Sequence, residues 1–384
     1  MRITGGEFFI VTLPLRRQHT WASNTRVSIG RHALVRIDTD EGVSGWGEAP
    51  AMATWGGPGG VHYGETPETV VHLGEDYLLP AITGCDPLDI AVVHDRMDAV
   101  VKGNPYAKAA LDIACYDAAG KGLGKPVWAL LGGKFRDGVQ LAHSLGLLPM
   151  DECLAEAKAA VAEGARTIKV KTGHDAQRDV EIVGRLREAL GPDIGIRVDG
   201  NEGYRTVHEA IAVTNAQQEF DIMLCEQPVA GDDAMAKVAA GVSVPVMADE
   251  SAWTALDIVR LHAMDAAACY SLYVTKPGGL YRARQQADIA AQYGMYSDVG
   301  GSIEMGIGNA ANLHLAAATR NAWLPSVCPV TTVDGTDGPT VAGVYYVDDV
   351  VSEPFGFRDG MVVLPDGPGL GVDVDVEKIR KYAE

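Results

Sequence analysis

The 384-residue sequence lacks several features that would assign it to other classes of protein. Its six cysteines are scattered without paired spacing, which argues against a disulfide framework or a cysteine-ligated metal and favours free thiols in a reducing cytoplasm. No apolar segment reaches the ~18 residues of a membrane helix, and residues 1–12 lack the basic stretch of a signal peptide. Basic residues are scarce: 32 Lys and Arg against 51 Asp and Glu give a net charge of −19, which argues against nucleic acids and anionic membranes as partners.

Composition and the order of expected elements instead indicate two globular domains. A hydrophobic content of 47% supports a large core. Residues 3–50 predict an antiparallel meander, and helices are expected over 67–79, 87–102 and 105–121. The tail beyond about residue 340 is rich in Val, Gly and Pro, and we expect it to return to this N-terminal unit. The expected division is a capping domain of residues 1–125 with the tail 340–384, and a barrel domain of residues 126–339.

Polar residues recur at the same end of successive strand–helix units. Apolar stretches ending in polar side chains, at 167–171, 196–199, 222–226, 244–249 and 270–273, follow one another every 23–28 residues. One strand, one helix and two loops need about this length. A first strand at 139–143, a seventh at 295–299 and an eighth near 323–330 complete a (β/α) barrel, whose active site lies at the carboxyl ends of the strands.

Three of these strand ends deliver a carboxylate, from Asp199, Glu226 and Asp249. Converging carboxylates repel one another unless a cation lies between them, and a set made only of oxygen ligands favours a hard divalent ion. We therefore expect a Mg²⁺ site, which Mn²⁺ could also fill. The alternative is three separate solvated acids at the rim of the barrel.

Lys169 and Lys171 are two residues apart on one expected strand, so they share a face. Each ammonium group and a nearby cation disfavour charge on the other lysine, which would lower a lysine pKa toward that of a general base. The alternative is a pair of lysines that extend to solvent at the rim.

Several other polar residues are candidates for substrate contact. Asn201 shares a face with Asp199, Glu250 adjoins Asp249, and Glu304 follows the seventh strand; each is otherwise an ordinary rim residue. His143 is either a substrate contact or a core histidine. The backbone amides of 306–310 form either an anion site or a plain tight turn. Two loops, 16–26 and 51–64, form either a lid over the pocket or mobile surface loops, and their candidate contacts are Trp21, Trp55 and Tyr63.

Together these residues resemble the enolase superfamily and, within it, the muconate-lactonizing group, which is muconate cycloisomerase-like. The likeness runs along the whole chain and is most specific in the lysine pair and the three acids. Further motifs that carry it are Tyr63 to Thr66, Asn104 to Ala110, Glu226 to Pro228, Asp249 to Ser251, Glu304 and Pro368 to Gly371.

This resemblance implies a fold, a cofactor and roles for the two lysines. The fold would be a (β/α)₇β TIM-like barrel with an α+β capping domain formed by the N-terminal region and the C-terminal tail. One Mg²⁺ would bind in the barrel, Lys171 would be the base, and Lys169 would stabilise the negative substrate oxygen. We also expect a cytoplasmic homo-oligomer that acts on a small-molecule carboxylate.

The sixth strand departs from the pattern of the family. The family usually places a catalytic lysine there, followed three residues later by Lys or Arg and then Gly-Gly, whereas this chain has Tyr273 first and Lys276 second. On a regular strand 273 and 276 cannot both face inward, unless Pro277 distorts the strand end. The mandelate-racemase group matches less well, because no His-Asp dyad occurs at strands six and seven.

The expected activity follows from this departure. The shared chemistry of the family is proton transfer at the carbon α to a carboxylate, through an enolate. With Tyr273 opposite Lys171, a one-base reaction is favoured, either cycloisomerisation of an unsaturated dicarboxylate or dehydration of a hydroxy acid by β-elimination. The alternatives are a racemase or epimerase of N-acylamino acids, dipeptides or related amino-acid derivatives, in which Tyr273 donates a proton on the second face, and a carboxylate binder without turnover.

Overall fold

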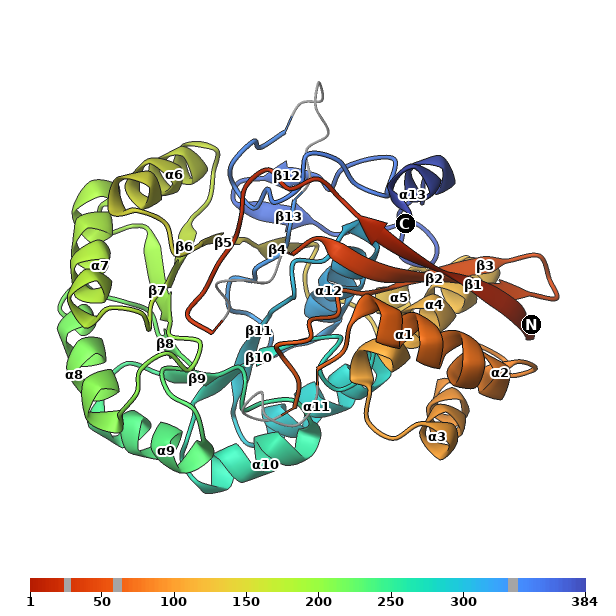
Figure 1. The fold of residues 1–384 in the computed structure, drawn as a ribbon, viewed down its shortest axis with the longest axis horizontal. Helices are drawn as coiled ribbons and strands as arrows, with labels where there is room; N and C mark the ends of the chain where they lie inside the picture. Colours follow the sequence, from red (N-terminus) through yellow and green to blue (C-terminus); the bar gives the residue numbers. More distant parts are fainter. Residues whose placement is uncertain (24–28, 58–63, 331–337) are drawn as a thin grey trace.

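The computed structural model of the chain describes residues 1–23, 29–57, 64–330 and 338–384. Its centre is a curled parallel sheet of seven strands in the order β11-β10-β9-β8-β7-β6-β5, with helices on the outside (Figure 1). The strands are β5 (Ala142–Leu145), β6 (Thr167–Lys171), β7 (Gly195–Asp199), β8 (Cys225–Glu226), β9 (Val246–Ala248), β10 (Cys269–Leu272) and β11 (Tyr296–Val299). The helices between and after them are α6 (Met150–Ala162), α7 (Ala176–Leu190), α8 (Val207–Gln218), α9 (Asp232–Gly241), α10 (Ala255–Ala263), α11 (Leu280–Gln292) and α12 (Gly306–Ala318).

The barrel strands are buried on both faces, as expected for parallel strands between a core and a helical layer. Every residue of β6 is buried, and so are the last four residues of β7. Apolar residues alternate with polar ones in both strands, and the charged side chains of Lys169, Lys171 and Asp199 are buried together with the apolar ones. The fold class expected from the sequence, a TIM-like barrel with a capping domain, is confirmed.

The barrel closes without a regular eighth strand among the described residues. Isolated bridges join Ser297 to Ala322 and Leu141 to Ser326, so the segment around 322–326 lies between β11 and the start of β5. The prediction of a strand near 323–330 is therefore correct in position but not in regularity. Pro325 and Pro329 lack the N–H groups that a strand ladder needs, which explains the difference.

The start of the barrel also differs from the sequence expectation. Residues of β4 (Gly138–Gln140) pair with β13 (Met361–Val363) of the tail, which in turn pairs with β12 (Phe357–Arg358). The first barrel strand is therefore β5, and the expected strand at 139–143 is divided between two sheets. The short helix α5 (Val127–Leu130) precedes β4.

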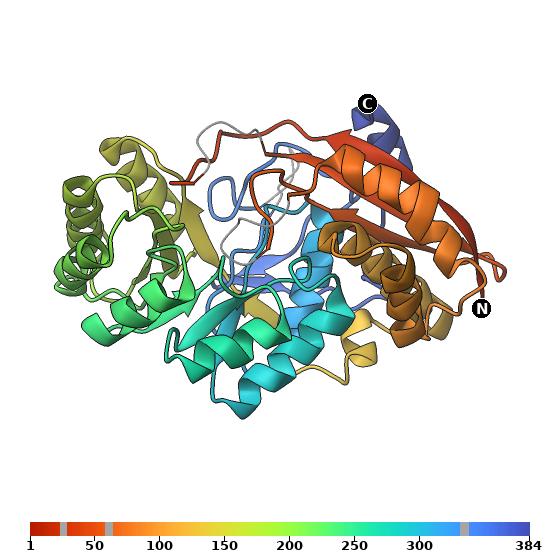
Figure 2. The same ribbon diagram turned by 60° about the horizontal axis from the view of Figure 1, so that its bottom comes forward.

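The N-terminal unit is a three-stranded antiparallel sheet of β1 (Ile3–Thr12), β2 (Arg31–Thr39) and β3 (Ser44–Ala49). Figure 2 shows this sheet and its helices to one side of the barrel. The helices are α1 (Pro67–Leu73), the π-helix η2 (Gly74–Leu78), α2 (Leu79–Ile82), α3 (Ile90–Val100) and α4 (Pro105–Leu123). None of the helices in the described part of the chain is long and apolar enough to cross a membrane.

Two glycines of β3 allow α4 to pack unusually close to the sheet. A Cβ atom added at Gly47 would lie 1.9 Å from the carbonyl oxygen of Ala110, and one added at Gly45 would lie 2.0 Å from that of Ala114. The face of α4 that carries Ala110, Ala114 and Ala118 therefore packs directly on the strand backbone at Gly45 and Gly47. Any larger residue at either glycine would separate the two elements.

The end of the tail lies against the N-terminal unit. Its last helix, α13 (Val376–Tyr382), ends beside β1, where Val11 bridges Ala383. The carboxylate of Glu384 accepts two hydrogen bonds of 2.7 Å from the Arg31 guanidinium. These contacts connect the two ends of the chain.

Candidate active site

The charged residues singled out in the sequence converge at the carboxyl ends of β6 to β9. In the strand register, Lys171 lies beside Asp199, and Asp199 lies beside Glu226. Asp249 follows directly after β9. The repeat of strand–helix units therefore brings together residues that are far apart in the sequence, as predicted.

The two lysines both point at this group of carboxylates. Lys169 Nζ lies 2.8 Å from Asp199 Oδ2 and 2.7 Å from Glu226 Oε1. Lys171 Nζ lies 2.7 Å from the same Asp199 oxygen and donates to Asn201 Oδ1 at 2.8 Å. The shared face expected from the spacing of two is observed, and neither lysine extends to solvent.

The pKa of Lys169 shifts in the direction opposite to that expected for a lysine of this pair. Burial lowers this pKa, but the charges of Asp199 and Glu226 outweigh burial and raise it above its ordinary value. Asp199 is buried, yet its two lysine partners lower its pKa. Burial and the charge on Asp199 raise the pKa of Glu226 to about 7. The expectation of a lowered lysine pKa considered the other cations but not carboxylates at hydrogen-bond distance.

The three acids fit a hard divalent cation by their chemistry. Glu226 Oε2 is buried and accepts no hydrogen bond from the described residues; its charged neighbour is Arg197, 3.5 Å away. Within the part of the chain that the structure describes, no three Asp, Glu, His or Cys side chains form a cluster ready to hold a metal. The lysines contact one oxygen of each acid, so a cation would bind the other oxygens, and the three side chains would have to move closer together to share it.

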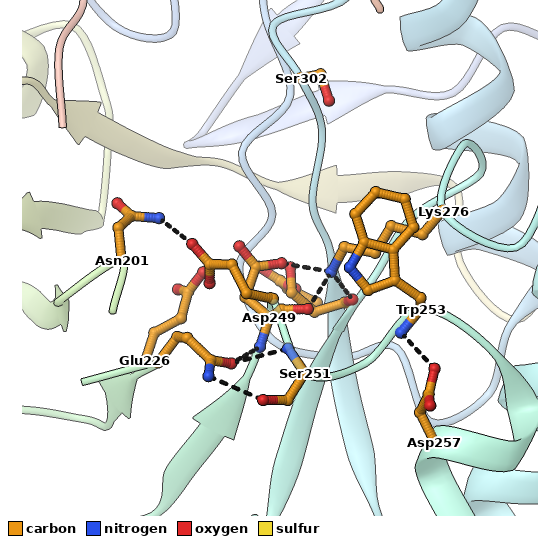
Figure 3. Close-up of polar contacts among 12 residues, drawn as sticks. Asn201, Glu226, Asp249, Ser251, Trp253, Asp257, Lys276 and Ser302 are labelled. Carbon is orange, nitrogen blue, oxygen red and sulfur yellow. Dashed lines mark hydrogen bonds and ion pairs between the residues drawn. The ribbon is translucent and has the colours of Figure 1, made fainter. Parts of the chain in front are cut away.

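The loop that carries Asp249 is fixed by an amide side chain and a buried lysine. Gln227 Oε1 accepts hydrogen bonds from the backbone N–H groups of Asp249 at 2.8 Å and Ser251 at 3.2 Å. Lys276 Nζ donates to Asp249 Oδ1 at 2.5 Å and to the Asp249 carbonyl at 2.8 Å (Figure 3). The sequence suggested neither role, although both residues belong to motifs noted there.

Tyr273 and Lys276 both reach the site, so the argument from strand alternation fails. Strand β10 ends at Leu272, and the residues beyond it form a turn in which the period of two no longer holds. Lys276 Nζ lies 4.0 Å from the centre of the Tyr273 ring, and the ring of Trp55 packs on that of Tyr273 with centres 5.2 Å apart. Tyr273 faces the pocket, and the ammonium group of Lys276 is held at Asp249.

A pocket of about 610 Å³, including the part open to solvent, lies above these groups. It contains the two lysines, the predicted contacts Trp21 and Trp55, and several residues that the sequence did not indicate. Tyr63 lies outside the described residues, and neither Lys276 nor Glu304 is among the described residues that line the pocket. The lining residues are His19, Trp21, Met52, Trp55, Ser144, Lys169, Lys171, Asn201, Asp249, Glu250, Tyr273, Gly300, Gly301, Ser302, Ile303, Val327 and Tyr345.

Asn201 and Glu250 are bound to each other. Asn201 Nδ2 donates to Glu250 Oε1 at 2.9 Å, while Glu250 Oε2 is buried without a hydrogen-bond partner in the described structure. The sequence did not indicate the neighbouring Glu202 as a site residue. Burial and the charge of Asp249 raise the pKa of Glu202 to about 7. Its signal in the sequence is an acid immediately after the Asp199–Asn201 motif.

Two other candidates from the sequence have structural partners. His143 Nε2 lies 2.9 Å from Glu156 Oε1, and His143 Nδ1 accepts from the backbone N–H of Gly343 at 2.9 Å, so it is a core histidine. The backbone amides at the N-terminus of α12 donate hydrogen bonds to carboxylate side chains of the protein itself. Glu48 of β3 accepts from the N–H groups of Met305 and Gly308, which joins the capping sheet to the barrel.

Comparison with known proteins agrees with this architecture. Residues 7–132 match the mandelate racemase / muconate lactonizing enzyme N-terminal domain, and residues 152–379 match the enolase C-terminal domain-like family. Muconate cycloisomerase 1 of Rhodococcus opacus is 33% identical, over 100% of this chain and 98% of its own length. Cis-3-hydroxy-L-proline dehydratase of Roseibium aggregatum is 31% identical over the full length of both.

A solved structure extends the comparison to a third reaction. The crystal structure of N-succinyl Arg/Lys racemase from Bacillus cereus superimposes with a TM-score of 0.90 at 28% identity, covering 100% of this chain and 98% of that one. These relatives are isomerases, racemases or lyases. Two matched domain families, full-length relatives above 30% identity and the shared barrel with its capping domain lead to one conclusion: the chain is an enzyme of the enolase superfamily, in the group that includes the muconate cycloisomerases.

Proposed function

We propose that this enzyme moves a proton at the carbon α to a substrate carboxylate, from one face, through an enolate. The observation that carries the proposal is the asymmetry of the pocket. Lys171 lines one side, and the phenol of Tyr273 lies at the end of β10, where the family usually has a second lysine. The nearby ammonium of Lys276 is bound to Asp249 and carbonyl oxygens.

Lys171 is the proposed base, because its surroundings orient its nitrogen. Asp199 Oδ2 and Asn201 Oδ1 hold Nζ at 2.7 and 2.8 Å, and the ring of Trp21 lies 5.8 Å from it. Lys169 is the proposed donor to the substrate oxygen on which negative charge develops, which stabilises the enolate. Binding of substrate and cation would require Lys169 to exchange its carboxylate partners for that oxygen.

We propose Mg²⁺ as the cation and Asp199, Glu226 and Asp249 as its ligands. The all-oxygen donor set and the unpartnered Glu226 Oε2 support this choice. A bound divalent cation would supply Lewis-acid stabilisation of the enolate. Members of this family are generally metal-dependent. The six cysteines are free and buried, which supports a reducing cytoplasm; a homo-oligomeric state stays a prediction.

Cycloisomerisation of an unsaturated dicarboxylate is the reaction that we favour, since it needs a single proton carrier. Burial and the nearby charge of Asp249 raise the pKa of Tyr273 well above its ordinary value, so its phenol stays protonated. A phenol of this kind is a poor second base, which argues against reversible racemisation. The same protonated phenol could act as the acid for a departing hydroxide, which makes dehydration of a hydroxy acid the second candidate.

Solvent exchange tests the proposal directly. The enzyme is incubated with Mg²⁺ in D₂O with cis,cis-muconate, a β-hydroxy acid and an N-succinylamino acid, and α-deuterium is followed by NMR. We expect one deuterium at the side-chain carbon α to the free carboxylate of the lactone formed from muconate, on a single face, and none with Lys171→Ala. Exchange on both faces would favour the racemase, and exchange with none of the compounds would refute the proposal.

A further inference from the structure

The pocket contains a histidine that the proposed chemistry does not use. His19 lies in the segment that follows β1, and its ring lines the pocket with only 4% of the residue exposed. Tyr345 fixes the plane of that ring, edge to face, with ring centres 5.3 Å apart at 74°. Trp21 lies beside it with a centre-to-centre distance of 6.2 Å. The ring is therefore held in place rather than free to turn.

A chain of charged groups holds one nitrogen of this histidine. Arg17 NH1 lies 3.1 Å from His19 Nδ1, and Arg17 NH2 donates to the carbonyl of Ser144 at 3.1 Å. The guanidinium also forms an ion pair with Glu156, whose carboxylate is held by His143. Apart from its sequence neighbours Gln18 and His19, Arg17 is held by the first barrel strand, through Ser144, and by the helix after it, through Glu156.

This arrangement determines where the proton of His19 resides. A guanidinium group only donates hydrogen bonds, so Nδ1 must be the acceptor and the proton is on Nε2. Among the described residues, none accepts a hydrogen bond from Nε2. Burial and the charges of Arg17, Lys171, His143 and Lys169 lower the pKa of His19 well below its ordinary value, so the ring stays neutral.

We propose that His19 is a specificity-determining residue whose neutral Nε2–H group binds an oxygen acceptor at the far end of the substrate, and that Arg17 is its positioning residue. The inference rests on the proposed function, because it concerns a carboxylate substrate in the same pocket. The acceptor is a carbonyl or carboxylate oxygen. Among the described residues that line the pocket, Lys169 and Lys171 are the cationic ones, and both are beside carboxylates. At the end of the pocket away from the two lysines, the hydrogen-bond donor is therefore the neutral Nε2–H group of His19.

Three probes of similar shape separate the acceptor from its charge. They are cis,cis-muconate, its monomethyl ester and cis,cis-hexa-2,4-dienoate. Their dissociation constants are measured with Mg²⁺ present from the fluorescence of the pocket residues Trp21 and Trp55 after rapid mixing, before turnover. The ester and the dienoate carry one carboxylate each, but only the ester has a second carbonyl. We expect the wild-type enzyme to bind the ester about 10-fold more tightly than the dienoate, the effect of one hydrogen bond. Tighter binding of muconate than of the ester would identify a carboxylate as the acceptor, and equal binding a neutral carbonyl.

Two substitutions of His19 distinguish the donor from the ring. His19→Phe keeps a ring but has no N–H group, and we expect it to lose the preference for the ester while binding the dienoate as the wild type does. His19→Gln restores a neutral N–H donor, so the preference should return. A wild-type preference below twofold, or a preference that survives in His19→Phe, would overturn the inference.

The role of Arg17 is tested through rescue. Arg17→Met removes the donor that keeps the proton of His19 on Nε2, so the preference for the ester should decrease, whereas Arg17→Lys keeps a donor and should retain the preference. The double variant Arg17→Met/His19→Gln should keep the preference of His19→Gln, because an amide has no tautomer to fix; an undiminished preference in Arg17→Met would overturn the positioning role. Deuterium exchange distinguishes failures: exchange with no His19-dependent preference sinks only this inference, whereas the preference without exchange sinks only the proposed function.

Discussion

Replacing Tyr273 by phenylalanine decides between one-face and two-face chemistry. The substitution removes one oxygen and keeps a ring that is tightly enclosed. Trp55 packs on that ring, Lys276 Nζ lies 4.0 Å from its centre, and a Cβ added at Gly300 would be 2.3 Å from its Cε2 atom. Because these contacts involve the ring and not the hydroxyl, we expect the variant to fold and to keep the shape of the pocket.

The size of the kinetic effect follows from the role of the hydroxyl. If Lys171 is the one obligatory proton carrier, Tyr273→Phe loses at most one hydrogen bond to substrate, a decrease in kcat/KM of about 10-fold or about 1.4 kcal/mol. If the phenol is a general acid, its removal should cost on the order of 10²–10⁴. The two expectations are far enough apart to be separated by steady-state rates alone.

The assay combines product formation with solvent exchange in D₂O, using Lys171→Ala as the control that removes the proposed base. We expect Tyr273→Phe to retain turnover and to place deuterium on the same single face as the wild type. Loss of stereochemical inversion, with exchange retained on the Lys171 face, would refute the one-base interpretation and favour a racemase. A large loss of dehydration with exchange retained would instead identify Tyr273 as the acid of the second candidate reaction.

Three further predictions follow from the charged groups. Asp249→Asn should abolish turnover and weaken Mg²⁺ binding measured by calorimetry while the circular dichroism spectrum is kept, and full activity after exhaustive EDTA treatment would contradict a metal role. Lys171→Ala should abolish α-proton exchange, whereas Lys169→Ala should leave slow exchange because it removes stabilisation of the enolate and not the base; wild-type exchange in Lys171→Ala would show that the assignment is wrong. Burial raises the pKa of Glu304 from 4.5 to about 7, so the folded state holds this proton more tightly than the unfolded state does. The resulting contribution to the free energy of unfolding, about 3 kcal/mol, is complete below about pH 4.5 and is lost as pH rises through 7. Chemical denaturation at pH 5 and pH 8 should therefore show a smaller decrease in the free energy of unfolding for Glu304→Gln than for the wild type. Equal decreases in the two proteins would refute the shift.

The sequence by itself determined the groups that depend on the periodicity of the chain. Parallel strands joined by helices bring their carboxyl ends to one edge, so the order of Asp199, Glu226 and Asp249 along the chain was enough to predict that they meet. Lys169 and Lys171 share a face because alternation holds within β6. These inferences depended only on local geometry and on the spacing of repeated units.

The tertiary structure decided what lies beyond the regular elements. Alternation ends with β10 at Leu272, so a turn allows Lys276 to reach Asp249 while Tyr273 faces the pocket. Glu48, from the capping sheet, accepts a hydrogen bond from an amide of α12. Arg17, which contacts Nδ1 of His19, is itself held by Glu156, 139 residues away in the sequence. The pKa of Lys169 rose because carboxylates from two other strands lie within 3 Å. Each of these depends on distances between segments that no local pattern specifies, because electrostatic and hydrogen-bond energies change steeply over a few ångströms.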